Sequence, residues 1–283
     1  MSHPSVDATL IDKQANLCYN KSTLKAKDGD ILKHEEYKRI CEQSDSAILF
    51  IHGIVGTPNH FLKLLPMVPD SVSVYSMLLD GHGKSARDFS HTSMKKWVAQ
   101  VEAVISELAK THRKIYVVGH SMGTLLAIEQ AIKNESIAAL FLMNVPLKIR
   151  LRAKWFATTM KIHFDRIKPD DHVALAAKSC YGIENDRNIF HYFGWIPRIF
   201  ELFSKIRQIR KSLCALKTPC IAYQAHSDEL VAKSSIKLLK QNPHISVGEL
   251  TGSGHYYPRR IRFQKALGEL SLVCRRYSQG SIT

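Results

Sequence analysis

Short runs of apolar, mostly β-branched residues alternate with longer amphipathic stretches along this chain from residue 47 onward. The runs are too short for helices and are typical of buried strands. The predicted strands are Ala47–Ile51, Val72–Met77, Ile115–Val118, Ala138–Met143, Cys220–Gln224 and Ser246–Leu250. The stretches between them predict helices at Pro58–Leu65, Ser93–Thr111, Met122–Lys133, Val231–Gln241 and Arg259–Tyr277. This alternation indicates an α/β fold with a mostly parallel, doubly wound sheet.

The alternation is interrupted between Pro146 and Thr218, where helical, aromatic and basic sequence takes the place of a core strand. An insertion after a core strand predicts a helical cap, or lid, over the carboxyl ends of the strands, where the sites of α/β proteins open. We therefore expect a first core part at residues 1–146, the cap at 147–217 and a second core part at 218–283. Before residue 47 we expect one or two antiparallel edge strands.

Composition places the chain among ordinary globular proteins, because its 283 residues and 45% hydrophobic content suffice for a sizeable core. The longest apolar run, Ile137–Met143, is far shorter than the about 20 residues of a membrane-spanning helix. The first residues lack the basic start and apolar block of a signal peptide. No C-x-x-C pair occurs among the cysteines, which are Cys18, Cys41, Cys180, Cys214, Cys220 and Cys274. We expect reduced thiols in a cytoplasmic protein, without a metal or other cofactor.

The net charge of +15 is unevenly distributed, since Leu147–Lys217 holds 15 Lys and Arg against 6 Asp and Glu. A basic surface attracts acidic substrates, anionic lipid or nucleic acid by long-range electrostatics. No helix-turn-helix, zinc-finger or RNA-binding signature accompanies the charge, so nucleic acid is not an expected partner. The oligomeric state cannot be derived from the sequence.

The pattern Gly-x-Ser-x-Gly at Gly119–Gly123 stands between a predicted strand and a predicted helix. A strand that turns sharply into a helix needs glycine on both sides of the turn, where side chains would clash. Such a turn exposes the hydroxyl of Ser121 and aims the helix N-terminus at the group that the serine attacks. Ser121 is therefore the candidate nucleophile.

A serine nucleophile needs a base that takes its proton and a third group that orients the base. Asp228 and His255 follow Ser121 in the order expected for such an elbow, each just beyond one of the last two strands. Glu229 is expected to begin the next helix instead. The backbone N–H groups of Met122 and Ile54 are the candidate donors to an oxyanion. The side chains of His52, His82 and His120 are expected to have structural roles.

Several motifs appear in the order found in one enzyme family. They are His52-Gly53-Ile54-Val55-Gly56-Thr57-Pro58, Leu79-Asp80-Gly81-His82-Gly83-Lys84-Ser85, Gly119-His120-Ser121-Met122-Gly123, Asp228-Glu229-Leu230-Val231 and Ser253-Gly254-His255. With them the chain, from about residue 45 to its end but without the cap, resembles a serine hydrolase of the α/β-hydrolase superfamily, in the carboxylesterase and monoacylglycerol lipase branch. Asp80, Thr124 and the loop Tyr256–Arg259 depart from the usual pattern of that branch.

The resemblance implies an enzyme that cleaves a carboxylic ester through a Ser121-His255-Asp228 triad and an acyl-enzyme. We expect a small acyl ester substrate with a short or medium chain, of the monoacylglycerol or lysophospholipid type, with an anionic head as one option. A thioesterase or peptidase would use the same triad, and a non-catalytic ligand-binding protein on this scaffold stays a further alternative. A membrane-surface role for the basic amphipathic stretch Pro197–Leu213 is also open, but a cap helix over the pocket is favoured, so peripheral membrane contact is not expected.

Overall fold

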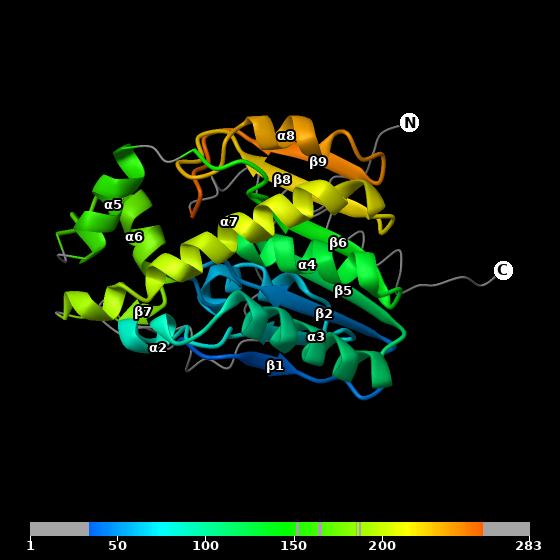
Figure 1. The fold of residues 1–283 in the computed structure, drawn as a ribbon. Coiled ribbons are helices and arrows are strands. Elements are labelled where there is room, and N and C mark those ends of the chain that lie inside the picture. Colours follow the sequence, from blue (N-terminus) through cyan, green and yellow to red (C-terminus); the bar gives the residue numbers. More distant parts are fainter. Residues whose placement is uncertain (1–33, 151–152, 164–165, 185, 187, 257–283) are drawn as a thin grey trace.

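The computed structural model describes residues 34–150, 153–163, 166–184, 186 and 188–256, and a mixed sheet forms the centre of this part (Figure 1). Its strands are ordered β1-β3-β2-β5-β6-β8-β9. They span Tyr37–Arg39 (β1), Ser46–Ile51 (β2), Ser73–Met77 (β3), Lys114–His120 (β5), Ile137–Met143 (β6), Cys220–Ala225 (β8) and Ile245–Leu250 (β9). Strand β1 is antiparallel to β3, and the other neighbouring pairs are parallel. The predicted core strands and the antiparallel edge strand are confirmed.

The helices follow the prediction less closely than the strands. They are α2 (Ala86–Ser90), α3 (Met94–Thr111), α4 (Met122–Lys133), α5 (Ala153–His163), α6 (His172–Cys180), α7 (Trp195–Ser212) and α8 (Ser234–Leu239), with 3-10 turns η1 (Pro58–Phe61), η2 (Leu65–Met67), η3 (Ile189–Tyr192) and η4 (Leu213–Ala215). The prediction of a helix at Pro58–Leu65 is wrong, since 3-10 turns occupy that segment. The helix predicted at Val231–Gln241 is present but shorter, as α8. The helix predicted at Arg259–Tyr277 lies outside the described residues.

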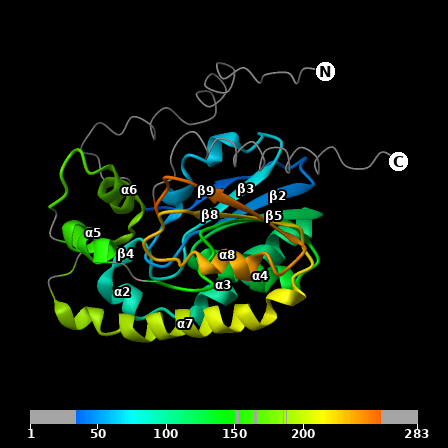
Figure 2. The ribbon, with the colours of Figure 1, turned by 90° about the horizontal axis from the view of Figure 1, so that it is seen from above.

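Both faces of the central strands are buried, which explains their uninterrupted apolar sequences. In β2, Ala47, Leu49 and Ile51 face a core that α3, α4 and α7 complete. Ile48 and Phe50 point to the opposite face and pack against the segment from residue 61 to 74. Figure 2 shows α3, α4 and α7 together on one side of the sheet. The predicted doubly wound α/β fold class is confirmed.

The strand order reverses at β2, whose neighbours are β3 on one side and β5 on the other. Loops that leave the carboxyl ends of two strands at such a reversal diverge, and the crevice between them is where α/β proteins bind ligands. The loops after β2 and β5 lie at this point, and the loops after β8 and β9 leave the same edge of the sheet. The topology therefore gathers the four predicted site segments at one edge.

The described residues of the predicted cap, 147–217, contribute no strand to the central sheet. Their β7 (Ile183–Glu184) pairs only with β4 (Lys84–Ser85) in a separate small sheet. Helices α5 and α6 lie beyond the carboxyl ends of the central strands, whereas the second half of α7 runs along α4 (Figure 1). None of the helices in the described part of the chain is long and apolar enough to span a membrane.

Candidate active site

The turn between β5 and α4 takes place at a single residue. Ser121 has φ 51° and ψ −121°, a conformation that a residue with a side chain rarely adopts and that costs about 1–3 kcal/mol. Its N–H donates to the carbonyl of Met143 at 2.9 Å, and the Thr124 hydroxyl donates to its carbonyl at 2.6 Å. Thr124, which departs from the family pattern, therefore helps to hold the strained turn.

The glycines on either side of Ser121 are required by close packing. A Cβ atom on Gly123 would lie 2.1 Å from the carbonyl oxygen of Ile51. A Cβ atom on Gly119 would lie 2.8 Å from Cα of Thr124. Both distances are shorter than any real contact between such atoms. Only glycine therefore lets α4 begin directly against β2 and β5.

The side chains of Ser121, His255 and Asp228 form one hydrogen-bonded row. The Oγ atom of Ser121 lies 3.1 Å from Nε2 of His255, and Nδ1 of His255 lies 2.8 Å from Oδ2 of Asp228. The other carboxylate oxygen, Oδ1, accepts the N–H groups of Leu230 at 2.8 Å and Val231 at 2.7 Å. All three members of the row are buried. The fold thus brings together the three residues singled out from the sequence, with Nε2 of His255 free to accept the serine proton when Nδ1–H faces the carboxylate.

The backbone of His255 is held by three side chains. Its N–H donates to Oε2 of Glu229 at 2.9 Å. Its carbonyl accepts from Nδ2 of Asn144 at 3.0 Å and from Nε2 of His120 at 3.1 Å. The prediction that Glu229 begins a helix is wrong, because α8 starts only at Ser234.

Asn144 is a positioning residue that sequence reasoning missed. It directly follows β6 and has φ 55°, and its Oδ1 accepts the N–H of Ala225 at 2.8 Å while its Nδ2 holds His255. One side chain thereby connects the ends of β6 and β8 to the loop that carries the imidazole. A short polar residue at the carboxyl end of a core strand was the available signal.

The loop after β2 approaches Ser121 closely. A Cβ atom on Gly53 would lie 3.0 Å from Cβ of Ser121. The ring of His52 fixes this loop, since its Nδ1 bonds the Gly53 carbonyl at 2.8 Å and its Nε2 accepts the Leu79 N–H at 3.0 Å. Gly53, Ile54, Ser121 and His255 line one small pocket. The Ile54 backbone therefore borders the space above the serine hydroxyl.

The second predicted oxyanion donor, the N–H of Met122, belongs to the first residue of α4. The N–H groups of a first helical turn have no acceptor within the helix, and the helix dipole makes this end partly positive. Both donor groups therefore flank Ser121, and their role in binding an oxyanion stays a prediction.

A larger cavity of about 220 Å³ opens beside His255. Apolar parts of Leu62, Ala176, Leu250 and Tyr256 contribute to its walls, so α6 of the predicted cap borders the site. Burial raises the pKa of the Cys180 thiol, which also lines the cavity, to about 11, so it behaves as a small apolar group. Among the described lining residues, Lys63 carries a positive charge.

Nucleophilic attack by a serine with an imidazole as base is the chemistry that this arrangement can perform. A fixed carboxylate holds one ring nitrogen of His255, and the hydroxyl of Ser121 reaches the other. Within the described part of the chain, no group of three or more His, Cys, Asp or Glu residues could hold a metal ion.

Four histidines near the site are held neutral by their surroundings. Burial lowers the pKa of His82 to about 4 and that of His60, stacked on His120, to about 3. Burial also holds the pKa values of His52 and His120 well below the usual 6.5. The hydrogen bonds of His52, His82 and His120 are to backbone groups, as the structural roles predicted for them require.

The same four histidines should make the protein sensitive to acid. Below about pH 6.5 they take up protons in the unfolded chain but stay neutral in the fold, so the free energy of unfolding falls as pH decreases. Each histidine lowers it by about 1.4 kcal/mol per pH unit, and the four together lower it by about 5.5 kcal/mol per pH unit. Urea unfolding between pH 7 and 5 should show this slope. His82→Phe should reduce the slope by about a quarter, whereas His172→Phe at an exposed position should leave it unchanged. Equal slopes in all three proteins would contradict the assignment.

Comparison with known proteins gives one family match over most of the chain. The family model described as serine aminopeptidase, S33, matches residues 42–251. In the curated proteins, 85 residues are 32% identical to the dihydrolipoyllysine-residue acetyltransferase component of the acetoin cleaving system of Cupriavidus necator. These residues are 30% of this chain and only 22% of that protein.

Solved structures resemble nearly the whole fold. A structure of LipS and LipT, metagenome-derived lipolytic enzymes, has a TM-score of 0.65 at 18% identity and covers 87% of this chain and 98% of its own. A monoacylglycerol lipase of Paleococcus ferrophilus has a TM-score of 0.59 at 17% identity and covers 85% of this chain and 98% of its own. At such identities the likeness concerns the fold alone, which is that of the α/β-hydrolases.

Proposed function

Because the chain belongs to the serine aminopeptidase S33 family, we propose that it is a serine hydrolase that cleaves carboxylic esters with short or medium acyl chains, of the monoacylglycerol or lysophospholipid type. Membership in an α/β-hydrolase family confirms the class expected from the sequence motifs. The observation that carries the proposal is the buried row of Ser121, His255 and Asp228 at the carboxyl edge of the sheet. We assign these residues as the catalytic triad.

In the proposed reaction, Oγ of Ser121 attacks the ester carbonyl while Nε2 of His255 takes its proton. The carbonyl oxygen becomes an oxyanion, which the N–H groups of Ile54 and Met122 stabilise. Collapse of the intermediate breaks the bond to the alcohol, which leaves with the proton from His255. Water, activated by the same imidazole, then hydrolyses the acyl-enzyme. Asp228 keeps His255 in the required tautomer and stabilises its cationic form.

The cavity beside His255 supports a small substrate. Its volume of about 220 Å³ is below the roughly 300–1,000 Å³ of sites for drug-sized ligands. Since His255 protonates the leaving group, we assign this cavity to the alcohol part of the ester. Lys63 lies at its exposed side and gives it a positive potential.

A peptidase is the second candidate, because the family model carries that description. An aminopeptidase must accept a free α-ammonium group, which a carboxylate would bind. Among the residues shown to line this cavity, Lys63 carries a cation, which repels an ammonium group and attracts an anion. The site therefore favours an ester with a neutral or anionic leaving part. Residues 147–217 are proposed to act as the cap that covers it.

Matched esters with neutral and anionic alcohols, offered in a series of acyl lengths, test this proposal together with an N-terminally free peptide substrate. We expect ester turnover with short and medium chains and, at low salt, a lower KM for the anionic ester. Lys63→Met should raise that KM by about two- to fivefold, as expected for an exposed cation, and high salt should remove the difference. Lys95→Met, an exposed substitution on α3, is the matched control. Peptide turnover without ester turnover would reverse the proposal.

A further inference from the structure

Large apolar side chains are exposed in a row on η3 and the first half of α7. This η3–α7 stripe consists of Phe190, Phe193, Ile196, Ile199, Phe200 and Phe203, which are between 41% and 69% exposed. Ile196, Phe200 and Phe203 follow one another at intervals of four and three residues, so they lie along one side of the helix. Soluble proteins rarely leave such a continuous apolar surface without a partner.

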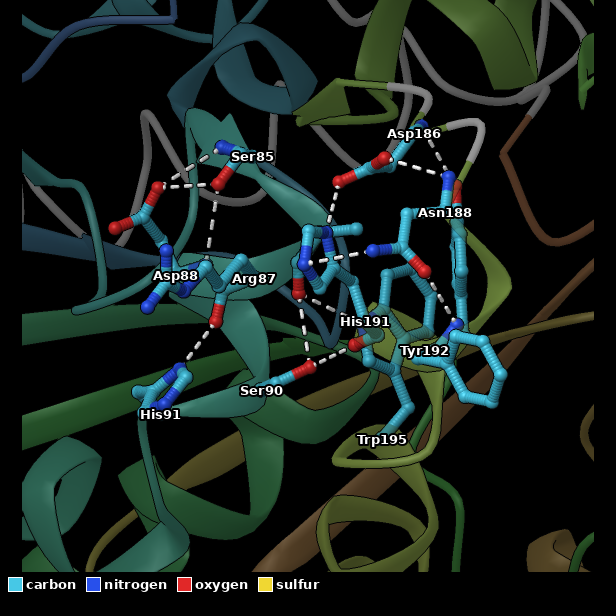
Figure 3. Close-up of polar contacts among 12 residues, drawn as sticks. Ser85, Arg87, Asp88, Ser90, His91, Asp186, Asn188, His191, Tyr192 and Trp195 are labelled. Atoms are coloured by element: carbon cyan, nitrogen blue, oxygen red, sulfur yellow. Dashed lines mark hydrogen bonds and ion pairs between the residues drawn. The ribbon is translucent and has the colours of Figure 1, made fainter.

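The segment that carries the η3–α7 stripe is held to α2 by hydrogen bonds. Figure 3 shows its inner contacts with α2, where the Ser90 hydroxyl donates to the His191 carbonyl and Nε1 of Trp195 donates to the Ala86 carbonyl at 3.1 Å. Arg198 donates from its guanidinium to the carbonyl of Ser90 at 3.1 Å. The segment is thus attached to the core through its polar groups, while the phenylalanine rings face outward.

The outward side of α7 changes from apolar to cationic along its length. After Phe203, the exposed residues on this side include Arg207, Arg210 and Lys211, and none of the three has an ion-pair partner among the described residues. The opposite side, with Leu202 and Ile209, is buried against the core. One helix surface therefore offers aromatic rings at one end and unpaired positive charges at the other.

We propose that this surface, residues 190–211, docks the protein on an anionic lipid surface. Aromatic and aliphatic side chains insert into the boundary between headgroups and acyl chains, and cations next to them bind lipid phosphates. Both requirements are met on one side of α7, in a chain of net charge +15. The first half of α7 lies on the same end of the sheet as α5 and α6 (Figure 1). Docking would therefore bring the first half of α7, on the same end of the sheet as α5 and α6, to the lipid, although the sequence analysis did not expect peripheral membrane contact.

Binding to vesicles tests this inference independently of catalysis, because the full-length Ser121→Ala protein can serve as the parent. It should co-sediment with phosphatidylcholine vesicles that contain phosphatidylserine and bind more weakly to phosphatidylcholine alone. Phe200→Glu with Phe203→Glu should weaken binding at least about tenfold. Arg207→Gln with Arg210→Gln should weaken it about fivefold per charge, and only for the anionic vesicles.

Lys237→Gln on α8 with Lys240→Gln at its C-cap removes two exposed charges. Helix α8 lies away from the stripe in both ribbon views, so this variant should leave binding unchanged. Thermal unfolding of each variant checks that the fold is retained. The inference is overturned if the parent ignores both vesicles or if the phenylalanine variant binds as tightly as the parent. It is also overturned if the parent forms a dimer that the phenylalanine variant abolishes, because the stripe would then be a subunit interface.

Discussion

Replacing Ser121 by Ala should lower kcat for ester hydrolysis by about 10⁴- to 10⁶-fold, as loss of the nucleophile does in other triads. The reason is that, within the described residues, Ser121 supplies the hydroxyl that contacts Nε2 of His255, beside the N–H groups of Ile54 and Met122. The fold should survive, since the bonds that hold the turn run through the backbone of residue 121 and the hydroxyl of Thr124.

Steady-state kinetics and covalent labelling measure this effect together. A fluorophosphonate should label the wild-type protein at Ser121, identified by mass spectrometry of the modified peptide, and should leave Ser121→Ala unlabelled. Ser204→Ala, at an exposed position on α7, is the matched control and should keep full labelling and activity. Rapid turnover by Ser121→Ala would remove the proposed mechanism and favour a ligand-binding protein on the hydrolase scaffold.

Asp228→Asn should lower kcat by about 10⁴-fold, as the corresponding change does elsewhere. Because Oδ1 of Asp228 accepts the N–H groups of Leu230 and Val231, the asparagine oxygen would stay there and its NH₂ group would face His255. Nδ1 of the imidazole must then accept a hydrogen bond, so the proton moves to Nε2. A protonated Nε2 cannot take the proton of Ser121.

Glu229→Gln separates this effect from a general disturbance of the loop. Glu229 accepts only the backbone N–H of His255 among the triad groups, and a glutamine oxygen can still accept it, so the loss of kcat should stay below about tenfold. Circular dichroism and thermal unfolding should show both variants folded. A mild loss for Asp228→Asn together with a severe loss for Glu229→Gln would transfer the orienting role to Glu229.

The core strands could be predicted because their apolar character is visible within a few consecutive residues. A strand covered on both faces needs an apolar residue at every position, as in Ala47–Ile51, where every residue is buried. The Gly119–Gly123 pattern was equally readable, because close approach of Gly123 to the Ile51 carbonyl admits no side chain. Once the strand order is known, the loops after β2, β5, β8 and β9 must meet at one edge of the sheet.

The helix errors have identifiable tertiary or backbone causes. The segment Pro58–Leu65 is divided between two 3-10 turns, η1 and η2, and a proline stands at the start of each, Pro58 in η1 and Pro66 in η2. The predicted start of α8 was too early because Asp228 and the backbone of residues 148–150 take the hydrogen bonds of residues 230–232. Neither the division into 3-10 turns nor the competing hydrogen bonds can be read from the apolar spacing of these two segments.

By itself, the sequence determined the sheet, the elbow and the identity of the three residues in the hydrogen-bonded row, since each depends on neighbours within a few positions or on a motif. Tertiary structure alone decided which groups hold His255, because Asn144 and Glu229 reach it from loops that are distant in the chain. It also decided that the outer side of α7 stays uncovered. Amphipathic spacing fixes which residues share a side of a helix, but only packing determines which side meets the core.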